Sequence, residues 1–434
     1  LTRETEAEVL RWKHMSRLGL KELKDILADL GFTLGMHTQS SSSSSSDASC
    51  KAAHKERKKA EASERRALRK LAWSAYTATH INHVGDVHWN DHVDVDRFDI
   101  AEREQRAESL GLPALPDPTA LADALGVAIP TLRWLCTHKD VDDGTHYRRF
   151  TIPKRDGSPR TIAEPMPLLK KSQRFLLENI VDKLEVHGAA HGFLADRSIV
   201  TNARAHAGAD VVVKLDVKDF FPTLSFARVK GLLRKAGLVE QVATLCALLA
   251  TEAPRDVVKF RNRTLYVATG PRALPQGAPS SPAITNAICL RLDKRMSGLA
   301  TKLGFVYTRY ADDLAFSWRG NKSAAPIGPL IGGARAILES EGFALHDKKT
   351  AVLTKGMRQK ITGLVVNEAP GRPPARVPRD VRRRLRAAIH NRRQGKPGAP
   401  GETLAALEGM AAFVFMTDPE QGRRFLDDVR SLSA

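Results

Sequence analysis

The chain has 434 residues, of which 68 are Lys or Arg and 49 are Asp or Glu, so its formal net charge is +19. Its 42% of hydrophobic residues exclude a disordered polyelectrolyte, and no run approaches the roughly 20 apolar residues that span a bilayer. The four cysteines form no Cys-x-x-Cys pair, which argues against a disulfide framework. We therefore expect a cytoplasmic, globular protein of about two to four domains with an acidic partner.

The first 110 residues are expected to form a mainly helical N-terminal extension. Residues 1–36 have leucines at helical spacing, and a serine-rich stretch at 40–46 is typical of a flexible linker. Residues 51–73 return to helical periodicity with nine Lys or Arg against three Glu. This basic segment is either a solvated helical face or a phosphate-binding face, and composition alone favours neither.

Histidines and aspartates alternate in the next segment, with histidines at His80, His83, His88 and His92. These side chains are of the types that bind metals, but their spacing is not that of a familiar zinc site. A polar, partly buried turn region is the more ordinary interpretation.

Strand patterns and turns begin near residue 147. Residues 147–153 and 160–162 flank a turn, and residues 210–217 form the most strongly β-branched segment of the chain. Residues 305–310 and 314–318 predict a tight hairpin, and residues 282–299 predict a helix with Ser281 as N-cap and Pro282 at the first position. This mixture predicts an α+β fold in which helices pack on one face of a sheet.

Three acids stand out because of their places in these strands. Asp216 lies near the end of a hydrophobic strand, and Asp312 and Asp313 lie at the hairpin tip. If the strands are neighbours, the carboxylates cluster and repel one another unless divalent cations lie between them. Two Mg²⁺ ions roughly 3.5–4 Å apart would activate an attacking hydroxyl and stabilise a leaving pyrophosphate.

The same residues resemble motifs of reverse transcriptases. Residues 310–313 are similar to the Y-x-D-D hairpin, residues 214–222 to the strand and turn with the first metal-binding aspartate, and residues 274–282 to the L-P-Q-G-x-x-x-S-P segment. The resemblance covers most of residues 130–420. It implies a right-hand polymerase fold, with fingers and an antiparallel palm at 111–365 and a helical thumb at 366–434, after the extension at 1–110.

The resemblance also implies roles for individual residues. The residues expected to bind the metal ions are Asp216, Val217, Asp312 and Asp313. Lys349 resembles the lysine that protonates the leaving pyrophosphate, with Lys348 as a near alternative. The residues expected to contact the incoming nucleotide are Lys154, Arg160, Phe220, Gln276 and Gly277, with Phe220 as the ring that rejects a ribose 2′-OH.

Two further segments resemble the bacterial retron branch of this family. Residues 202–206 resemble its N-A-x-x-H segment, and residues 361–367 its V-T-G segment, with Ile361 in place of Val. The resemblance implies an enzyme that copies part of its own structured RNA from a guanosine 2′-OH and leaves a branched RNA–DNA used in phage defence. The residues expected to bind RNA are Asn202, His206, Thr362, Gly363, Arg382, Arg383 and Arg386.

Residues 372–393 contain nine arginines and a single acid, Asp380. Val381, Leu385 and Ile389 recur at every fourth position, so an apolar seam can dock while arginines face phosphates. The implied partners are a cognate non-coding RNA as template and primer, the RNA–DNA product, dNTPs, a separate RNase H and an effector protein, with no membrane. The alternatives are a group II intron-like or other bacterial reverse transcriptase, or a non-catalytic RNA-binding scaffold or maturase.

Overall fold

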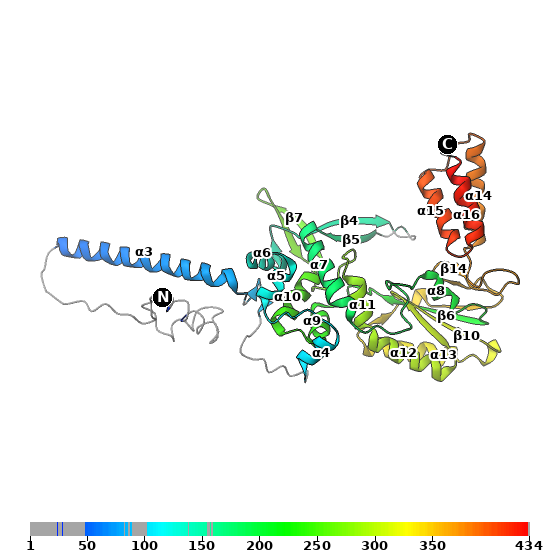
Figure 1. Ribbon diagram of the computed structural model, residues 1–434, viewed down its shortest axis with the longest axis horizontal. Coiled ribbons are helices and arrows are strands. Elements are labelled where there is room, and N and C mark those ends of the chain that lie inside the picture. Colours follow the sequence, from blue (N-terminus) through cyan, green and yellow to red (C-terminus); the bar gives the residue numbers. More distant parts are fainter. Residues whose placement is uncertain are drawn as a thin grey trace. The chain divides into compact units, whose positions relative to one another are not determined.

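The protein is described by a computed structural model at residues 24, 28, 48–81, 83–85, 87–88, 102–137, 139–153, 157 and 159–432. Its contacts divide the chain into two compact units (Figure 1). The first unit contains Leu1–Lys183 and Ser225–Pro279, and the second contains Leu184–Leu224 and Ser280–Ala434. These boundaries differ from the expected divisions after residues 110 and 365, because the chain leaves the first unit, returns to it and leaves it again.

The first unit is built around one buried helix. All residues of α10 (Glu240–Ala250) from Val242 to Ala250 are buried, as expected for a helix that is apolar all round. The helices that pack directly against it are α5 (Pro118–Leu125), α6 (Ile129–Cys136), α7 (Pro167–Asn179) and α9 (Phe226–Lys235). The remaining helices of this unit are α3 (Ala48–Thr79), α4 (Arg103–Ser109) and the short η1 (Val181–Lys183). The expected basic helix at 51–73 is confirmed as part of α3.

Two antiparallel sheets complete this helical core. β4 (Tyr147–Pro153) and β5 (Pro159–Pro165) form the expected hairpin, with Ile152 opposite Arg160. β3 (Val141–Asp142), β8 (Arg263–Ala268) and β7 (Arg255–Phe260) form a three-stranded sheet in that order. A two-residue pair, β1 (His83–Val84) and β2 (Val87–His88), lies earlier in the chain. Nearly all of residues 1–36, the serine-rich stretch at 40–46 and the part of the histidine-rich segment that contains His92 fall outside the described residues.

The second unit is organised by an antiparallel sheet with β6 (Val211–Lys218) at its centre. The order is β11 (Ala344–Leu345), β6, β10 (Asp313–Trp318) and β9 (Val306–Tyr310), and β12 (Ala351–Thr354) also pairs with β6. Strand β6 is buried along nearly its whole length, which agrees with its β-branched sequence. The strand predictions at 210–217, 305–310 and 314–318 are confirmed.

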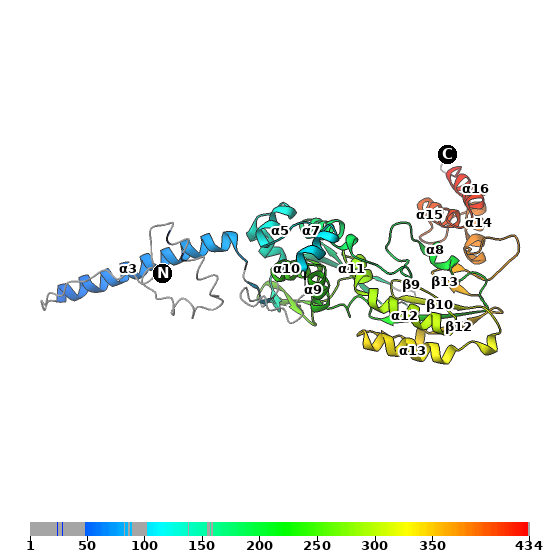
Figure 2. The same ribbon diagram turned by 60° about the horizontal axis from the view of Figure 1, so that its bottom comes forward.

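Helices cover both faces of this sheet, and not one face as expected (Figure 2). α12 (Leu290–Leu303) and α13 (Ile327–Ser340) lie on one side, and α8 (Ile199–Arg204) lies on the other. The predicted helix at 282–299 is two helices, α11 (Ser281–Ile288) and α12, which meet at Cys289; Ser280, not Ser281, is the N-cap. Short elements join these parts: η2 (Lys322–Ala324), η3 (Asp347–Lys349), β13 (Lys360–Ile361) and β14 (Leu364–Val365).

Three C-terminal helices pack on α8's side of the sheet. They are α14 (Arg379–Arg393), α15 (Leu404–Phe415) and α16 (Pro419–Arg430). Leu385 and Ile389 are buried in a core that also contains Val212 and Ala315 of the sheet, so the expected apolar seam is confirmed. Within the described residues, no helix is both long enough and apolar enough to cross a membrane.

Candidate active site

The three acids are brought together by strand pairing. Asp313 is the direct cross-strand partner of Asp216 in the antiparallel pair β10–β6. The Val217 amide donates to the Asp312 carbonyl oxygen at 3.0 Å, which ties the hairpin turn to the same strand. Directly opposed residues have Cβ atoms about 4.5–5.5 Å apart, so the expected juxtaposition of the acids is confirmed.

The turn between β9 and β10 is short and is contacted by the loop at residues 191–192. It contains Ala311 at φ 56°, a region that residues with a Cβ seldom adopt. A Cβ on Gly192 would lie 3.0 Å from the Ala311 amide nitrogen, so a side chain there would crowd the turn. The His191 amide donates to the Arg309 carbonyl at 2.8 Å, which pairs the same loop with the edge of β9.

Lys349 contacts the acidic cluster through Asp216. Its Nζ donates to Asp216 Oδ1 at 2.9 Å and to Oδ2 at 3.1 Å. Partial burial opposes its charge, but the bond to Asp216 and the neighbouring acids prevail and raise the pKa of Lys349. Lys349 rather than Lys348 therefore contacts the cluster, since no contact of Lys348 with an acid is found among the described residues.

The charged forms of the other two acids, Asp312 and Asp313, are destabilised by their surroundings. Burial raises the pKa of Asp312, and the charges of Asp313 and Asp216 raise it further. Burial also raises the pKa of Asp313, with Asp216 adding to the shift and Lys214 opposing it. An added cation would relieve both effects, because it favours the charged form of each group.

The donor set suits a hard divalent cation. Carboxylate oxygens are the ligands that Mg²⁺ prefers, and Asp216, Asp312 and Asp313 supply three carboxylates. Among the described residues, no three carboxylate, histidine or cysteine side chains already converge as a finished metal site. The ammonium of Lys349 instead neutralises Asp216, so a metal ion would replace part of that interaction.

A buried ion pair connects strand β9 of the acidic hairpin to helix α12. Arg309 on β9 and Asp293 on α12 are both fully buried and share bonds of 2.9, 3.1 and 2.7 Å. The Tyr307 hydroxyl donates to Asp293 at 2.8 Å, and Arg309 Nη1 donates to Asn286 at 3.0 Å. Our sequence reasoning missed this support. The sequence does contain a signal for it: Arg309 lies in a strand that also contains valine and two tyrosines. An arginine buried in such a strand requires an acidic partner.

Asn202 and His206 lie inside the fold, which contradicts their expected contact with RNA. Each is 1% exposed. His206 is hydrogen-bonded through Nδ1 to Ser317 Oγ and through Nε2 to Thr308 Oγ1, both at 2.7 Å. Asn202 Oδ1 accepts from Thr308 Oγ1 at 2.6 Å. The N-A-x-x-H segment therefore braces both strands of the catalytic hairpin, since Thr308 belongs to β9 and Ser317 to β10.

The turn at residues 362–363 joins this brace. Asn202 Nδ2 donates to Thr362 Oγ1 at 3.4 Å, and Thr362 Oγ1 donates to the Ile199 carbonyl at 3.1 Å. Thr362 and Gly363 both have positive φ, 43° and 91°, in the tight connection between β13 and β14. Thr362 and Gly363 are partly exposed.

Phe220, the ring expected to contact the sugar, is buried. Phe220 is 3% exposed and its ring packs on Phe343 with centroids 5.5 Å apart. Phe221 is partly exposed and meets Phe220 edge-on at 5.8 Å. Phe220 is therefore a core residue in this structure, and two adjacent phenylalanines cannot be told apart from sequence alone.

Apart from Phe220, the described residues expected to bind the nucleotide lie in the first unit. Arg160 is exposed on β5. The Ala163 amide of the same strand donates to the Gln276 carbonyl at 2.8 Å. Gly277 has φ 116°, and a Cβ there would lie 2.9 Å from the Ala163 carbonyl oxygen. The hairpin and the Gln276 loop are thus joined directly, and Lys154 lies outside the described residues.

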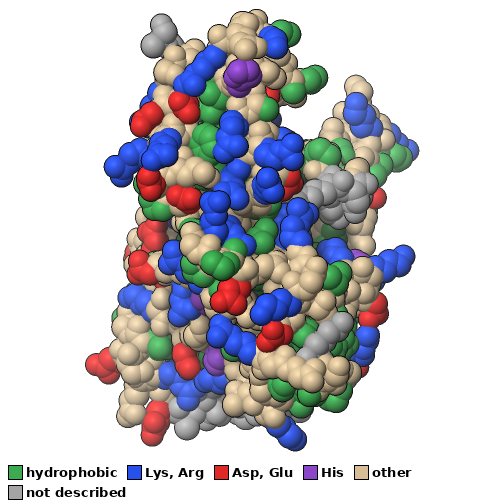
Figure 3. All heavy atoms as spheres, turned by 90° about the vertical axis from the view of Figure 1, so that its right-hand side faces the viewer, with side chains coloured by type: hydrophobic (Ala, Val, Ile, Leu, Met, Phe, Trp, Pro, Cys, Tyr) green, Lys and Arg blue, Asp and Glu red, His purple; other side chains and the backbone are tan. Residues whose placement is uncertain are grey.

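An arginine-rich groove of about 890 Å³ lies on the second unit. Its lining contains Gln421 and seven arginines: Arg358, Arg372, Arg376, Arg379, Arg382, Arg383 and Arg386. Figure 3 shows Lys and Arg side chains gathered on this face. Burial lowers the pKa of Arg376, and the charges of Arg382 and Arg372 lower it further. An anion in the groove would offset this mutual repulsion.

Two of the nine arginines in the basic segment have other contacts. Arg392 pairs with Glu402 at 3.2 Å and Arg393 pairs with Asp428 at 2.5 Å. These ion pairs connect α14 to the chain near α15 and to α16, so Arg392 and Arg393 contribute to the helical bundle and not to the groove.

Comparison with known proteins agrees with this site. A profile of the family described as reverse transcriptase (RNA-dependent DNA polymerase) matches residues 152–372. The chain is 57% identical to the Retron Mx162 reverse transcriptase of Myxococcus xanthus, covering 86% of this chain and 79% of that protein. It is 40% identical to the Retron Mx65 reverse transcriptase of the same organism, covering 75% of this chain and 74% of that protein. It is 30% identical to the Retron Ec86 reverse transcriptase of Escherichia coli, covering 75% of this chain and 92% of that protein. With its acids paired across β6 and β10, this chain belongs to the reverse transcriptases, the RNA-directed DNA polymerases, and within them to the retron reverse transcriptases.

Proposed function

We propose that this retron reverse transcriptase copies part of a cognate structured RNA into single-stranded DNA that stays joined to the RNA through a branch, in phage defence. The observation that carries the polymerase chemistry is the register of β6 and β10, which pairs Asp216 with Asp313. The similarity to the retron enzymes supports the choice of RNA and product. We assign the fingers to the first unit and the palm and thumb to the second.

The acidic residues would hold two Mg²⁺ ions. We assign the ligands to the side chains of Asp216, Asp312 and Asp313 and to the backbone of Val217. When bound, the ions would activate the attacking hydroxyl and stabilise the leaving pyrophosphate. The raised pKa values of Asp312 and Asp313 support this assignment, because both carboxylates gain from a nearby cation.

Other side chains would position the nucleotide and the proton. Lys349 is a proton donor suited to the pyrophosphate, because its ammonium already lies at Asp216. Phe221 is the partly exposed ring after Asp216 that could contact the sugar. The residues proposed to bind the triphosphate and the template–nucleotide pair are Lys154, Arg160, Gln276 and Gly277.

The arginine groove would hold the RNA. Arg382, Arg383 and Arg386 line one continuous surface, and their planar guanidinium groups match phosphate oxygens. Thr362 and Gly363 form a partly exposed turn in the same unit and could add contacts to RNA. A separate RNase H would remove copied template, and an effector protein would act with the product.

One experiment separates this function from its alternatives. The full chain would be purified from cells that carry its genomic neighbourhood, and the bound nucleic acid would be sequenced. A short RNA with DNA joined at an internal 2′ position is expected. A long intron RNA would favour the intron-like alternative.

The paired variant Asp312→Ala, Asp313→Ala tests the chemistry in the same preparation. The variant should still co-purify with RNA but not with DNA, because the acids are needed for DNA synthesis and not for RNA binding. Full DNA synthesis by this variant would refute the metal assignment. RNA without DNA in the unmodified protein would favour a non-catalytic scaffold.

A further inference from the structure

A second groove, of about 960 Å³, lies entirely within the first unit. Its walls come from β4, β5, the beginning of α7 and the ribbon β7–β8. None of the residues assigned above to the acidic cluster, the nucleotide or the arginine groove lines it. It therefore needs an explanation of its own.

The groove carries an excess of positive charge. Arg148, Lys171 and Arg174 are exposed at its wall, and none of them forms an ion pair with a carboxylate among the residues that the structure describes. Glu164 is the one acid in the lining, and it pairs with Lys170 at 2.9 Å. Arg148 lies opposite Glu164 in the β4–β5 pair, and its charge helps to lower the pKa of Glu164. The lining still has more cations than acids, and its concave surface strengthens their attraction for an anionic occupant.

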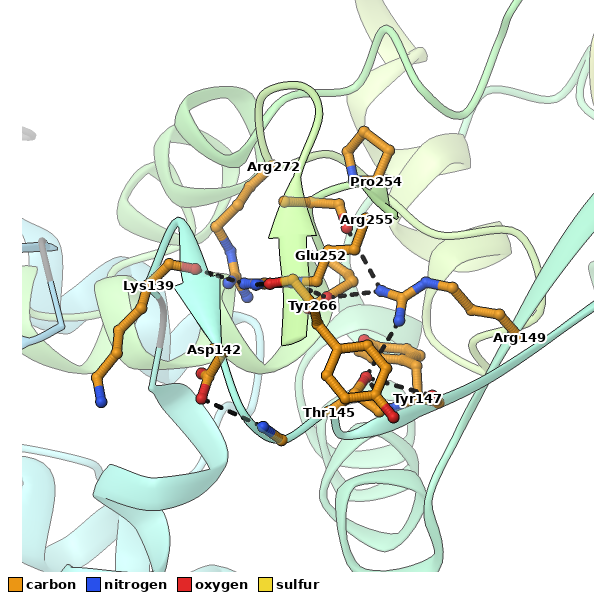
Figure 4. A network of polar contacts seen from close by, with 12 residues as sticks. Lys139, Asp142, Thr145, Tyr147, Arg149, Glu252, Pro254, Arg255, Tyr266 and Arg272 are labelled. Carbon is orange, nitrogen blue, oxygen red and sulfur yellow. Dashed lines mark hydrogen bonds and ion pairs between the residues drawn. The ribbon is translucent and has the colours of Figure 1, made fainter. Parts of the chain in front are cut away.

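The floor of the groove is built by hydrogen bonds. Arg149, whose side chain is 18% exposed, donates to Glu252 at 2.7 Å and to Thr145 Oγ1 at 3.1 Å. Glu252 also binds Arg255 at 3.1 Å, and Arg255 Nη1 donates to the Tyr266 carbonyl at 3.0 Å. Figure 4 shows this network around Tyr266. Tyr266 is therefore fixed through its backbone by the same network that orders the floor.

The groove also presents apolar surface to solvent. Met166 is 43% exposed and Val257 is 61% exposed, and Tyr266, the cross-strand partner of Val257, is partly exposed in the same lining. The ribbon continues to Phe260, which is 57% exposed and has the guanidinium of Arg261 5.2 Å from its ring centre. Aromatic rings alternating with cations suit a single strand, whose bases can stack while its phosphates meet the charges.

We propose that this groove binds an unpaired RNA segment, with phosphates against Arg148, Lys171 and Arg174 and a base against the ring of Tyr266. The choice of RNA rests on the proposed function, because the enzyme works on a structured RNA with unpaired regions. An RNA duplex fits less well, since its bases are already stacked and hidden from Tyr266. An acidic peptide would use the cations but would leave the ring without a partner.

The proposal is tested by the affinity of the RNA-free full chain for an unstructured RNA oligonucleotide and for an RNA duplex. Tyr266→Ala should weaken single-strand binding by about tenfold, the stacking contribution of one base, and Tyr266→Phe should preserve it. Arg174→Glu should lower the slope of log affinity against log salt by roughly 0.7 or more. Lys235→Glu is the matched control, because Lys235 is exposed on α9 of the same unit and does not line the groove.

The measurements distinguish an unpaired RNA strand from an RNA duplex and from an acidic peptide. Unchanged single-strand affinity in both Tyr266→Ala and Arg174→Glu would overturn the proposal. An equal loss of duplex binding in Tyr266→Ala would overturn the assignment to an unpaired strand. Loss in Arg174→Glu alone, with Tyr266→Ala unaffected, would favour a purely charged occupant such as an acidic peptide. DNA synthesis by the unmodified chain is measured separately, so failure of the proposed function is distinguishable from failure of the groove.

Discussion

Lys349 and Lys348 are adjacent residues with different surroundings. Lys349 bonds to both oxygens of Asp216, while Lys348 has no contact with the acids in the described part of the chain. A proton donor must lie within hydrogen-bond reach of the group that it serves, so geometry distinguishes two lysines that look alike in sequence.

Lys349→Ala is expected to lower the rate of nucleotide incorporation at saturating dNTP by about 10²-fold, the lower range for loss of a general acid. Lys348→Ala should change it less than threefold. Single-turnover incorporation on a primed template measures both. Equal losses in the two variants would contradict the assignment.

Phe220 and Phe221 form a second adjacent pair. Phe220→Ala should lower the free energy of unfolding by about 3–5 kcal/mol, because a 3% exposed ring leaves a cavity. Phe221→Ala should cost less stability and should raise incorporation of ribonucleotides relative to deoxyribonucleotides. Thermal unfolding and competition between rNTP and dNTP measure the two effects. Increased ribonucleotide use in Phe220→Ala, with none in Phe221→Ala, would restore Phe220 as the gate.

At the scale of elements, α8 fixes the catalytic hairpin through a buried polar network. His206 contacts Thr308 on β9 and Ser317 on β10, and Asn202 contacts Thr308 as well. Burial, with a smaller contribution from the charge of the nearby His191, lowers the pKa of His206 to about 3. The folded protein therefore holds His206 in its neutral form.

This network predicts that the free energy of unfolding decreases as the pH is lowered. The folded pKa of His206 lies below its ordinary value, so the unfolded chain takes up the proton first as the pH falls. The contribution of His206 is complete above pH ~6.5 and should decrease by about 2 kcal/mol at pH 5. Urea unfolding from pH 7.5 to 5 measures this slope.

His206→Gln should lower stability at pH 7.5 and flatten the slope, because the titrating group is gone. His390→Gln, at an exposed position on α14, is the control and should leave the slope unchanged. An unaltered slope in His206→Gln would show that other groups cause the pH dependence.

At the scale of the whole molecule, the net charge of +19 has an uneven distribution. Seven arginines line one groove of the second unit, and the first unit carries a groove lined by five Lys or Arg and one Glu. The acids cluster on β6 and β10. Charge of one sign would hold a polyanion, and the local reversal of charge would hold the metal ions that react with it.

The paired variant Arg382→Glu, Arg386→Glu should weaken RNA binding and lower the slope of log affinity against log salt by roughly 1–2. Arg424→Glu is the control, because Arg424 is 76% exposed on α16 and pairs only with Glu420 among the described residues. Filter binding at several salt concentrations measures the slopes. Equal effects in the two proteins would show that net charge, and not the groove, governs binding.

The sequence by itself determined the strands, the acidic hairpin and the family. β-branched runs and short turns are local signals, and the motifs at 214–222, 274–282 and 310–313 are contiguous, so their chemistry can be read without a fold. The apolar seam of α14 was predictable for the same reason, since its spacing follows one helix.

Only the tertiary structure decided which side chains face solvent and which are buried. Asn202 and His206 were expected to contact RNA, but both are buried and form hydrogen bonds to Thr308 inside the fold. Arg309 and Asp293 lie 16 residues apart and meet only when α12 packs against β9. Burial and long-range hydrogen bonding depend on elements distant in sequence, and for that reason the same polar residue types can serve the core or the ligand.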